Sequence, residues 1–261
     1  MPLVVTPIII TLDEAPNIER VLARLHWAGT VLVVDSGSTD GTQAIAQRFA
    51  NVQLVEHTFI DAASQWNFAI GQARAFSSWL LALDSDYVLS DEFIDSVRLL
   101  PHAPKVDAYR ASFVYCVHGR ALRGSLYPAK PVLFNADCAR YTQRGHTQVL
   151  QVDGKIGEVG GLIFHDDRKP RSRWLRSQWR YAREEAELID RNSWAKLGWS
   201  ARMRKLLFAA APAAFLLALF WRGAVFDGWH GLLYALERLV AELLITIALL
   251  ERKLAGVEQH K

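Results

Sequence analysis

The feature that most constrains this fold is the regular alternation, over the first hundred residues, of apolar strand-like runs and helical patterns. Residues 7–11 and 31–34 form β-rich runs, and apolar side chains recur at helical spacing between them, over residues 18–25. The rhythm continues with helices expected at 41–49 and 67–75 and strands expected at 52–55 and 79–83. Parallel strands need crossovers, and helices then cover both faces of the sheet. The pattern predicts an α/β fold with a Rossmann-like, mostly parallel sheet flanked by helices.

After residue 101 the pattern loosens into shorter strands. We expect these at 108–117, 132–134, 149–152 and 162–164. They are expected to complete a first domain that spans residues 1–170. A charged, aromatic-rich helix at 173–191 then opens a helical C-terminal region, residues 171–261.

The last sixty residues are more apolar than the rest. The uncharged stretch 206–221 would reach roughly 24 Å as a helix, short of the roughly 30 Å hydrocarbon core of a bilayer, and Pro212 interrupts it. The stretch 232–250 carries Glu237, Arg238 and Glu242, which are costly in a span but suit an amphipathic interfacial helix. We therefore expect a membrane-associating extension. Spanning helices, or soluble helices that close a core or an oligomer, remain alternatives.

Composition and charge exclude little. The formal net charge is +3, and basic residues are spread along the chain, so no nucleic-acid partner is indicated. The two cysteines, Cys116 and Cys138, lack the spacing of a zinc site or a disulfide framework, which favours a reducing compartment. Residues 1–11 lack the basic start of a signal peptide and are expected to form a strand.

The first candidate site is the turn at 33–42, where a strand runs into small residues and then a helix. Asp35, Gly37 and Ser38 lie at the carboxyl end of the expected strand, where open α/β sheets bind ligands. Asp35 would accept hydrogen bonds from a base or ribose, and the small residues would let a ligand approach the backbone. The alternative is a plain turn that caps the next helix.

The second candidate site is the pair of carboxylates that ends the strand at 79–83. Asp84 and Asp86 flank Ser85, and two carboxylates that share a small space repel unless a cation or proton lies between them. This favours a hard divalent metal that bridges diphosphate oxygens. The alternative is a cap for the helix after Ser90, although the pair lies early for that role.

Together these motifs resemble the family 2 glycosyltransferases of the GT-A fold. Residues 10–18 look like the family's first strand and nucleotide loop, Gln65-Trp66-Asn67 looks like its Gln-x-Asn motif, and Asp84-Ser85-Asp86 looks like its DxD motif. The chain looks most similar to WaaE-like lipopolysaccharide-core glucosyltransferases, which share the Asp-Ser-Gly-Ser-Thr-Asp turn. They also share a late Asp-Gly-Trp, here Asp227-Gly228-Trp229.

The resemblance implies a nucleotide site and a metal site. The residues expected to contact the donor are Thr11, Asp13, Glu14, Asp35, Gly37, Ser38, Gln65, Asn67, Arg74, Asp84 and Ser85, with Arg74 or Arg168 offsetting charge on the leaving phosphates. Asp86 and Asp84 are expected to ligate Mg²⁺ or Mn²⁺. His165, at the end of an apolar strand, is the expected third ligand; the alternative for a lone histidine is a structural side chain.

The general base is where the sequence departs from the resemblance. Related enzymes carry a Val-His-Glu-like segment, but residues 144–148 read Arg-Gly-His-Thr-Gln, and a glutamine cannot accept a proton. The candidate bases are therefore His146, Asp167 and Asp166.

The resemblance also implies an activity. We expect an inverting, metal-dependent hexosyltransferase that moves a sugar from a nucleotide-sugar, with UDP as the default, to a lipid-linked saccharide of the bacterial envelope, such as lipopolysaccharide. Its expected place is the cytoplasmic face of the inner membrane, as a peripheral or monotopic protein. Two alternatives stay open: a polyprenyl-phosphate glycosyltransferase, and a non-catalytic membrane-anchored protein that binds sugar nucleotides.

Overall fold

The computed structural model describes residues 2–144 and 147–258, and the chain divides into two compact units. Unit 1 comprises Met1–Ala121 and Tyr127–Arg168, and unit 2 comprises Leu122–Leu126 and Lys169–Lys261. The division falls close to the expected domain boundary after residue 170. It differs at Leu122–Leu126, which the sequence placed in the first domain and which the fold incorporates into unit 2.

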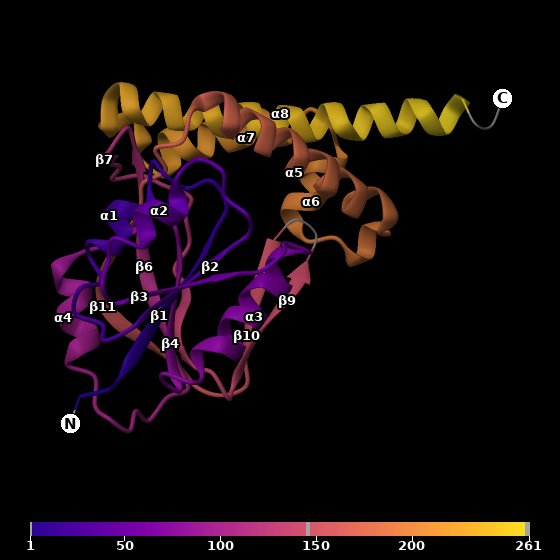
Figure 1. Ribbon diagram of the computed structural model, residues 1–261. Helices are drawn as coiled ribbons and strands as arrows, with labels where there is room; N and C mark the ends of the chain where they lie inside the picture. The colour runs from indigo at the N-terminus through magenta and orange to yellow at the C-terminus, as the bar shows by residue number, and fades with distance from the viewer. Residues whose placement is uncertain (1, 145–146, 259–261) are drawn as a thin grey trace. The chain divides into compact units, whose positions relative to one another are not determined.

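Unit 1 is built on a curled, nine-stranded mixed sheet (Figure 1). The strand order is β3-β2-β1-β4-β8-β6-β11-β5, with β7 paired to β6. The strands are β1 Val5–Thr11, β2 Val31–Asp35, β3 Val52–Glu56, β4 Trp79–Asp84, β5 Tyr87–Leu89, β6 Ala108–Val117, β7 Arg120–Ala121, β8 Lys130–Asn135 and β11 Ile156–His165. A separate two-stranded sheet pairs β9 Ala139–Arg144 with β10 Thr147–Val152.

Only half of the main sheet is parallel throughout. Strands β3, β2, β1 and β4 run parallel, as expected, but β8 is antiparallel to both β4 and β6, and β5 is antiparallel to β11. Beyond β4 the sheet is mixed rather than mostly parallel, because only β6 and β11 pair in parallel there. Because no helix lies between β6 and β8 to carry the chain back across the sheet, the two strands run in opposite directions.

Strands β1, β2 and β4 of the parallel half are buried on both faces, and the edge strand β3 is partly exposed. Alternate residues of its strands enter two separate hydrophobic cores, so Ile9 belongs to one and Ile8 to the other. Helices α1 Ile18–Leu22 and α4 Asp91–Arg98 contribute to the first core, and α3 Ala62–Ala73 contributes to the second. The short helix α2 Thr42–Ala46 follows the turn after β2. The expected α/β arrangement, with helices on both faces, is confirmed.

Capping residues decide where two helices begin. Asp61 and Ser64 form a reciprocal capping box, so α3 starts at Ala62, five residues before the expected start. Ser90 caps α4, because its hydroxyl accepts a hydrogen bond from the Phe93 backbone N–H at 3.1 Å. Asp84 and Asp86 therefore do not cap this helix.

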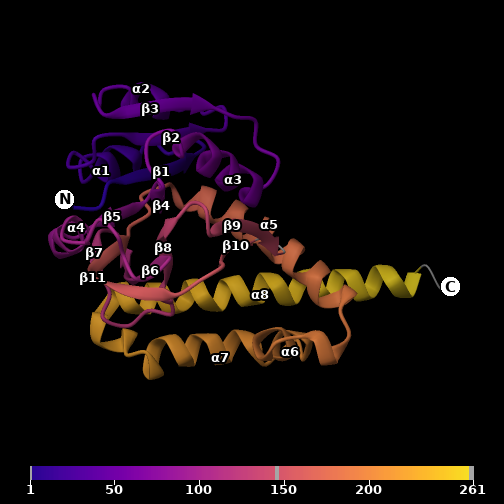
Figure 2. The same ribbon diagram turned by 90° about the horizontal axis from the view of Figure 1, so that it is seen from below.

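Unit 2 is helical. Its elements are α5 Arg171–Arg191, η1 Trp194–Lys196, α6 Trp199–Lys205, α7 Ala210–Leu216, η2 Leu217–Trp221, η3 Ala224–Asp227 and α8 Gly228–Glu258. Figure 2 shows α6 and α7 running beside α8. Alanine and aliphatic side chains of α5 and α8, including Ala186 and Ala248, form a small core.

The charges of α8 are used inside unit 2. Glu242 and Glu185 both pair with Arg204, at 2.6 and 2.8 Å, and the buried Glu237 pairs with Arg171. The expected interfacial role of this helix stays a prediction. These carboxylates tie α8 to α5 and α6. None of the helices within residues 2–144 and 147–258 combines the length and apolarity needed to cross a bilayer.

Candidate active site

Asp35 organises the turn that follows β2. Its buried carboxylate accepts hydrogen bonds from the backbone N–H groups of Gly37 and Ser38, at 2.9 and 2.8 Å. It also accepts bonds from the Thr11 hydroxyl at 2.7 Å and the Gln43 amide at 2.8 Å. Burial raises the pKa of Asp35, but the hydrogen bonds outweigh this effect and hold its pKa below the usual value. The side chain therefore shapes the loop as an ionised acceptor.

Hydrogen bonds join the two loops that follow β1 and β2. The Asp13 N–H donates to the Ser38 hydroxyl at 2.8 Å, and the Asp13 carboxylate accepts from the Thr39 N–H at 2.8 Å. The Glu14 N–H donates to the Thr42 hydroxyl at 2.7 Å. Asp13 adopts a positive φ of 54°, which is uncommon outside glycine. The predicted donor residues Thr11, Asp13, Glu14, Asp35, Gly37 and Ser38 thus lie in two adjacent segments joined by hydrogen bonds, with Thr11 and Asp35 buried.

The Gln-x-Asn motif braces elements around the site. Gln65 is buried and donates to the Ser36 hydroxyl at 2.9 Å, while its carbonyl oxygen lies 2.7 Å from His57 Nδ1. Asn67 exchanges two hydrogen bonds with the backbone of Tyr141, at 2.8 and 2.9 Å, and so holds β9 against α3. Donor contacts by Gln65 and Asn67 stay predictions, because their amides serve these internal bonds.

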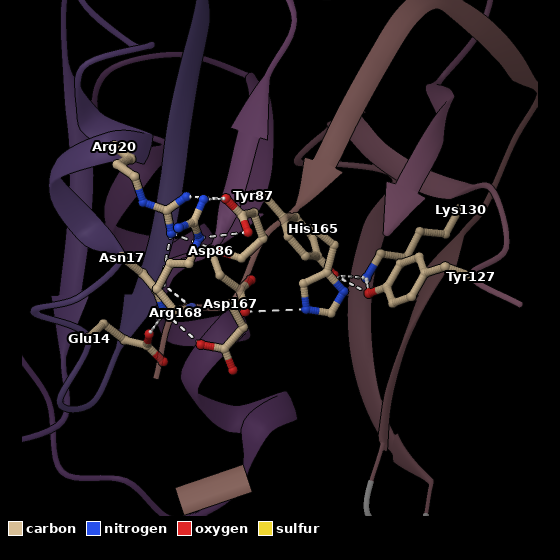
Figure 3. A network of polar contacts seen from close by, with 11 residues as sticks. Glu14, Asn17, Arg20, Asp86, Tyr87, Tyr127, Lys130, His165, Asp167 and Arg168 are labelled. Atoms are coloured by element: carbon tan, nitrogen blue, oxygen red, sulfur yellow. Dashed lines mark hydrogen bonds and ion pairs between the residues drawn. The ribbon is translucent and has the colours of Figure 1, made fainter. Parts of the chain in front are cut away.

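The turn between β4 and β5 presents the second acidic motif. Ser85 is buried and donates to the Ile10 carbonyl at 2.8 Å, which ties the turn to β1. Asp86 Oδ2 lies 3.3 Å from His165 Nε2, so the predicted pair of ligands from β11 and the β4–β5 turn is brought together (Figure 3). Burial lowers the pKa of His165, whereas Asp86, and secondarily Asp84, raise it, and the net pKa shift is upward. Both carboxylates therefore act on the same imidazole.

The Asp86–His165 pair fits a divalent cation. Two ligands at neighbouring corners of an octahedral Mg²⁺ site lie about 3 Å apart. The His165 Nδ1 atom is buried and has no hydrogen-bond partner within the described part of the chain. Across those same residues, however, no group of three or more His, Cys, Asp or Glu side chains is spaced as a finished metal site. The three predicted ligands are therefore not brought together, and Asp86 and His165 supply only two of the ligands that a divalent cation needs.

An aromatic and basic cluster, which the sequence reasoning missed, surrounds His165. The rings of Tyr87, Tyr115 and Tyr127 lie 5.3, 4.9 and 4.8 Å from the imidazole. Lys130, on β8, donates to the Tyr87 hydroxyl at 2.7 Å and to the Tyr127 hydroxyl at 3.3 Å. Burial raises the pKa of Tyr87 well above its usual value, so its hydroxyl stays protonated. Position 87 directly follows the acidic motif, but nothing in the sequence pattern marks Lys130.

The candidate bases at 166 and 167 have different surroundings (Figure 3). Asp166 is buried between two guanidinium groups, with Arg20 at 2.6 Å and Arg168 at 2.8 Å. Both oxygens of Asp166 accept hydrogen bonds from these guanidinium groups, so Asp166 does not fit the role of base. Asp167 accepts a hydrogen bond from Asn17 at 2.9 Å, and the same amide nitrogen donates to Glu14 at 2.9 Å. This links Asp167 to the loop after β1.

Arg74 lies at the end of the sheet opposite the candidate site. It donates to the Ala136 carbonyl at 2.6 Å, and Ala136 in turn bonds to Ser78, which precedes β4. Asp84 is the last residue of the six-residue strand β4 and lies about 17 Å from Trp79, the first residue of that strand. The expectation that Arg74 contacts the donor is therefore wrong. Arg168 is also committed, since its guanidinium pairs with Asp166. His146 lies outside the described residues.

Comparisons with known proteins agree with this architecture. The α/β fold, with polar loops gathered at the carboxyl ends of β1, β2 and β4, is GT-A-like. Residues 6–130 match the sequence model described as Glycosyl transferase family 2.

Two relatives are uncharacterized glycosyltransferases of Rickettsia felis and Rickettsia bellii. They are 31% and 32% identical over 108 residues, which is 41% of this chain. The chain spans only 37% and 36% of their lengths. The structure of S. aureus TarS in complex with UDP-GlcNAc aligns with 98% of this chain and 92% of TarS, at a TM-score of 0.51 and 14% identity. That likeness shows the fold.

Proposed function

We propose that this chain is a nucleotide-sugar-dependent, inverting glycosyltransferase that uses a lipid-linked saccharide of the bacterial envelope as acceptor. The observation that carries the proposal is the pairing of Asp86 with His165 beside the Asp35 loop, at the carboxyl edge of a GT-A-like sheet. The family 2 domain match supports the reaction class. The TarS complex supports a UDP-sugar donor, because its fold is similar and it holds UDP-GlcNAc.

The chain's own residues have distinct roles in the proposed reaction. The loops that follow β1 and β2 bind the nucleoside, with their shape held by Asp35. Asp167 accepts the proton of the acceptor hydroxyl, and the resulting oxygen attacks the anomeric carbon as its bond to the diphosphate breaks. A single displacement of this kind inverts the configuration of the anomeric carbon. Asn17 positions Asp167 by its hydrogen bond.

Asp86 and His165 would hold the divalent cation, Mg²⁺ or Mn²⁺. When bound, such a cation offsets the negative charge of the departing diphosphate. Lys130 adds a fixed positive charge next to His165, because its ammonium is anchored by the hydroxyls of Tyr87 and Tyr127.

A polyprenyl-phosphate glycosyltransferase is the second candidate, and Lys130 is the observation that favours it. A phosphate nucleophile needs no strong base, and residues 144–148 lack the glutamate of related enzymes. An ammonium near the metal-binding pair would instead attract the phosphate. In this version Asp167 is dispensable and Lys130 is not.

A transfer assay tests both candidates. The purified chain is incubated with UDP-, GDP- and dTDP-sugars and Mn²⁺, and with either a lipid-linked saccharide or undecaprenyl phosphate. We expect transfer to the saccharide, lost in Asp167→Asn and Asp86→Asn but retained in Asp95→Asn, whose carboxylate is exposed on α4. Transfer only to undecaprenyl phosphate would favour the second candidate. Donor binding without any transfer would favour the non-catalytic alternative.

A further inference from the structure

The segment 208–229 of unit 2 has its large apolar side chains on the outside and its small ones on the inside. The buried apolar positions of α7, η2 and η3 are alanines: Ala210, Ala211, Ala218 and Ala224. The exposed positions include Phe208 at 78%, Phe220 at 61% and Trp221 at 82% exposure. A helix of a water-soluble domain normally has the opposite pattern, with its large apolar residues against the core.

The exposed side chains form one stripe. Leu216 and Phe220 lie four residues apart along α7 and η2, and Leu217 and Trp221 repeat that spacing one position later. Phe208 lies two residues before α7 begins. Past the turn at Gly223, Phe226 is 76% exposed and Trp229 is 83% exposed. We call this set the apolar stripe: Phe208, Leu216, Leu217, Phe220, Trp221, Val225, Phe226 and Trp229. An exposed apolar patch of this kind marks an interaction site.

The turn that presents the end of the stripe is held firmly. The buried Asp227 carboxylate accepts hydrogen bonds from the backbone N–H groups of Arg123 and Gly124, at 3.0 and 3.2 Å. A Cβ at Gly231 would lie 1.8 Å from the Ala224 carbonyl oxygen, so α8 packs directly against η3. Asp227 and Gly228 of the Asp-Gly-Trp motif therefore serve the turn, while Trp229 points outward.

Apart from the buried Asp227, the charged residues of the chain between 192 and 229 are all basic. Residues 192–226 contain five basic residues and no acidic one: Lys196, Arg202, Arg204, Lys205 and Arg222. Arg204 is neutralised by Glu185 and Glu242, but Arg202 and Lys205 donate to backbone carbonyls, which leaves their charge in place. Basic residues next to exposed Trp and Phe are the composition of a surface that lies in the headgroup region of an anionic bilayer.

We propose that the apolar stripe inserts into the interface of an anionic lipid bilayer, with the neighbouring basic residues on the lipid headgroups. The inference deepens the proposed function, on which it rests for its purpose, because a lipid-linked acceptor is met at a bilayer. Binding itself requires neither donor nor turnover. A second copy of the chain is the competing occupant of the stripe, and the experiment separates the two.

The test is co-sedimentation of the full chain with vesicles of phosphatidylcholine, with and without phosphatidylglycerol, at low and high salt. The variant Phe220→Ser/Trp221→Ser removes two exposed rings without opening a core cavity. The matched control is Val4→Ser/Leu99→Ser, two exposed apolar side chains of unit 1. We expect the wild type and the control to bind phosphatidylglycerol vesicles, more weakly at high salt. The Phe220/Trp221 variant should lose about tenfold in partition coefficient for each ring.

Equal vesicle binding by the Phe220/Trp221 variant and the wild type would overturn the proposal. The proposal would also be overturned if the wild type did not bind vesicles but dimerised through the stripe in analytical ultracentrifugation. Quenching of tryptophan fluorescence by brominated acyl chains tests insertion in the unmodified chain, and its absence would also overturn the proposal. Donor binding is measured separately in vesicle-free solution, so a failure of the proposed glycosyltransferase function is distinguishable from a failure to bind lipid.

Discussion

Replacing Asp35 by asparagine separates a structural role from a ligand-binding role. The carboxylate accepts three N–H bonds at one oxygen, from Gly37, Ser38 and Gln43. Its other oxygen accepts the hydroxyls of Thr11 and Ser38. In Asp35→Asn the amide oxygen would face the N–H donors, and the amide nitrogen would face the hydroxyls, which can turn to accept. The contacts survive, but their charge is lost.

The expected cost follows from that change. Hydrogen bonds to a charged group are worth more than neutral ones, so we expect the free energy of unfolding to fall by about 2–3 kcal/mol. For a chain of this size that corresponds to a melting temperature lower by about 4–12 °C. The assay is thermal unfolding followed by circular dichroism, together with donor affinity measured well below the melting temperature.

The pH dependence has a definite sign. The pKa of folded Asp35 is lowered, so its stabilising contribution is fully present above the unfolded pKa of about 3.9 and is lost as the pH falls through the folded pKa. The gap in melting temperature between wild type and Asp35→Asn should therefore be complete at neutral pH and should close below about pH 4. An unchanged melting temperature combined with lost donor binding would refute the reasoning. Asp95→Asn, on an exposed face of α4, controls for the loss of a carboxylate.

Four further variants have expected outcomes. Asp166→Asn leaves two guanidinium groups without their shared anion and should destabilise unit 1 by about 3 kcal/mol in urea unfolding. Asp167→Asn should leave the stability unchanged and lower the turnover number by about 10² or more. The reverse pattern would exchange the roles of the two residues. Arg74→Ala should leave the donor Kd within about twofold in calorimetry, and a larger loss would contradict its placement away from the site. Asp227→Ala should lower the melting temperature of unit 2 through a loss of about 1–3 kcal/mol, and an unchanged value would show that its bonds to Arg123 and Gly124 contribute nothing.

The strands in the first half of the fold could be predicted because each is a short, continuous apolar run in the sequence. The runs around Ile9, Val33 and Leu81 are buried on both faces, and this leaves a continuous apolar signature in the sequence. The direction of β8 could not be predicted in this way, because periodicity reports burial and carries no information on pairing partners. The membership of Leu122–Leu126 in unit 2 depends on Asp227, about a hundred residues away.

Part of the candidate site was predictable from the sequence. The pairing of Asp86 with His165 was expected, because the family resemblance implies a later histidine as a metal ligand and His165 ends an apolar strand. The commitment of Asp166 to two arginines, and the place of Lys130 beside Tyr87 and Tyr127, arise from long-range packing. Arg74 was misplaced because it ends a helix that runs away from the site.

The most direct test of the account is the effect of Mn²⁺ on UDP-sugar affinity, measured by isothermal titration calorimetry for the wild type and Asp86→Asn. If Asp86 and His165 hold the cation that binds the diphosphate, Mn²⁺ should lower the Kd of the wild type for the donor by about tenfold or more. The tightening should disappear in Asp86→Asn, with the melting temperature little changed. An equal response to Mn²⁺ in both proteins would contradict the proposed site.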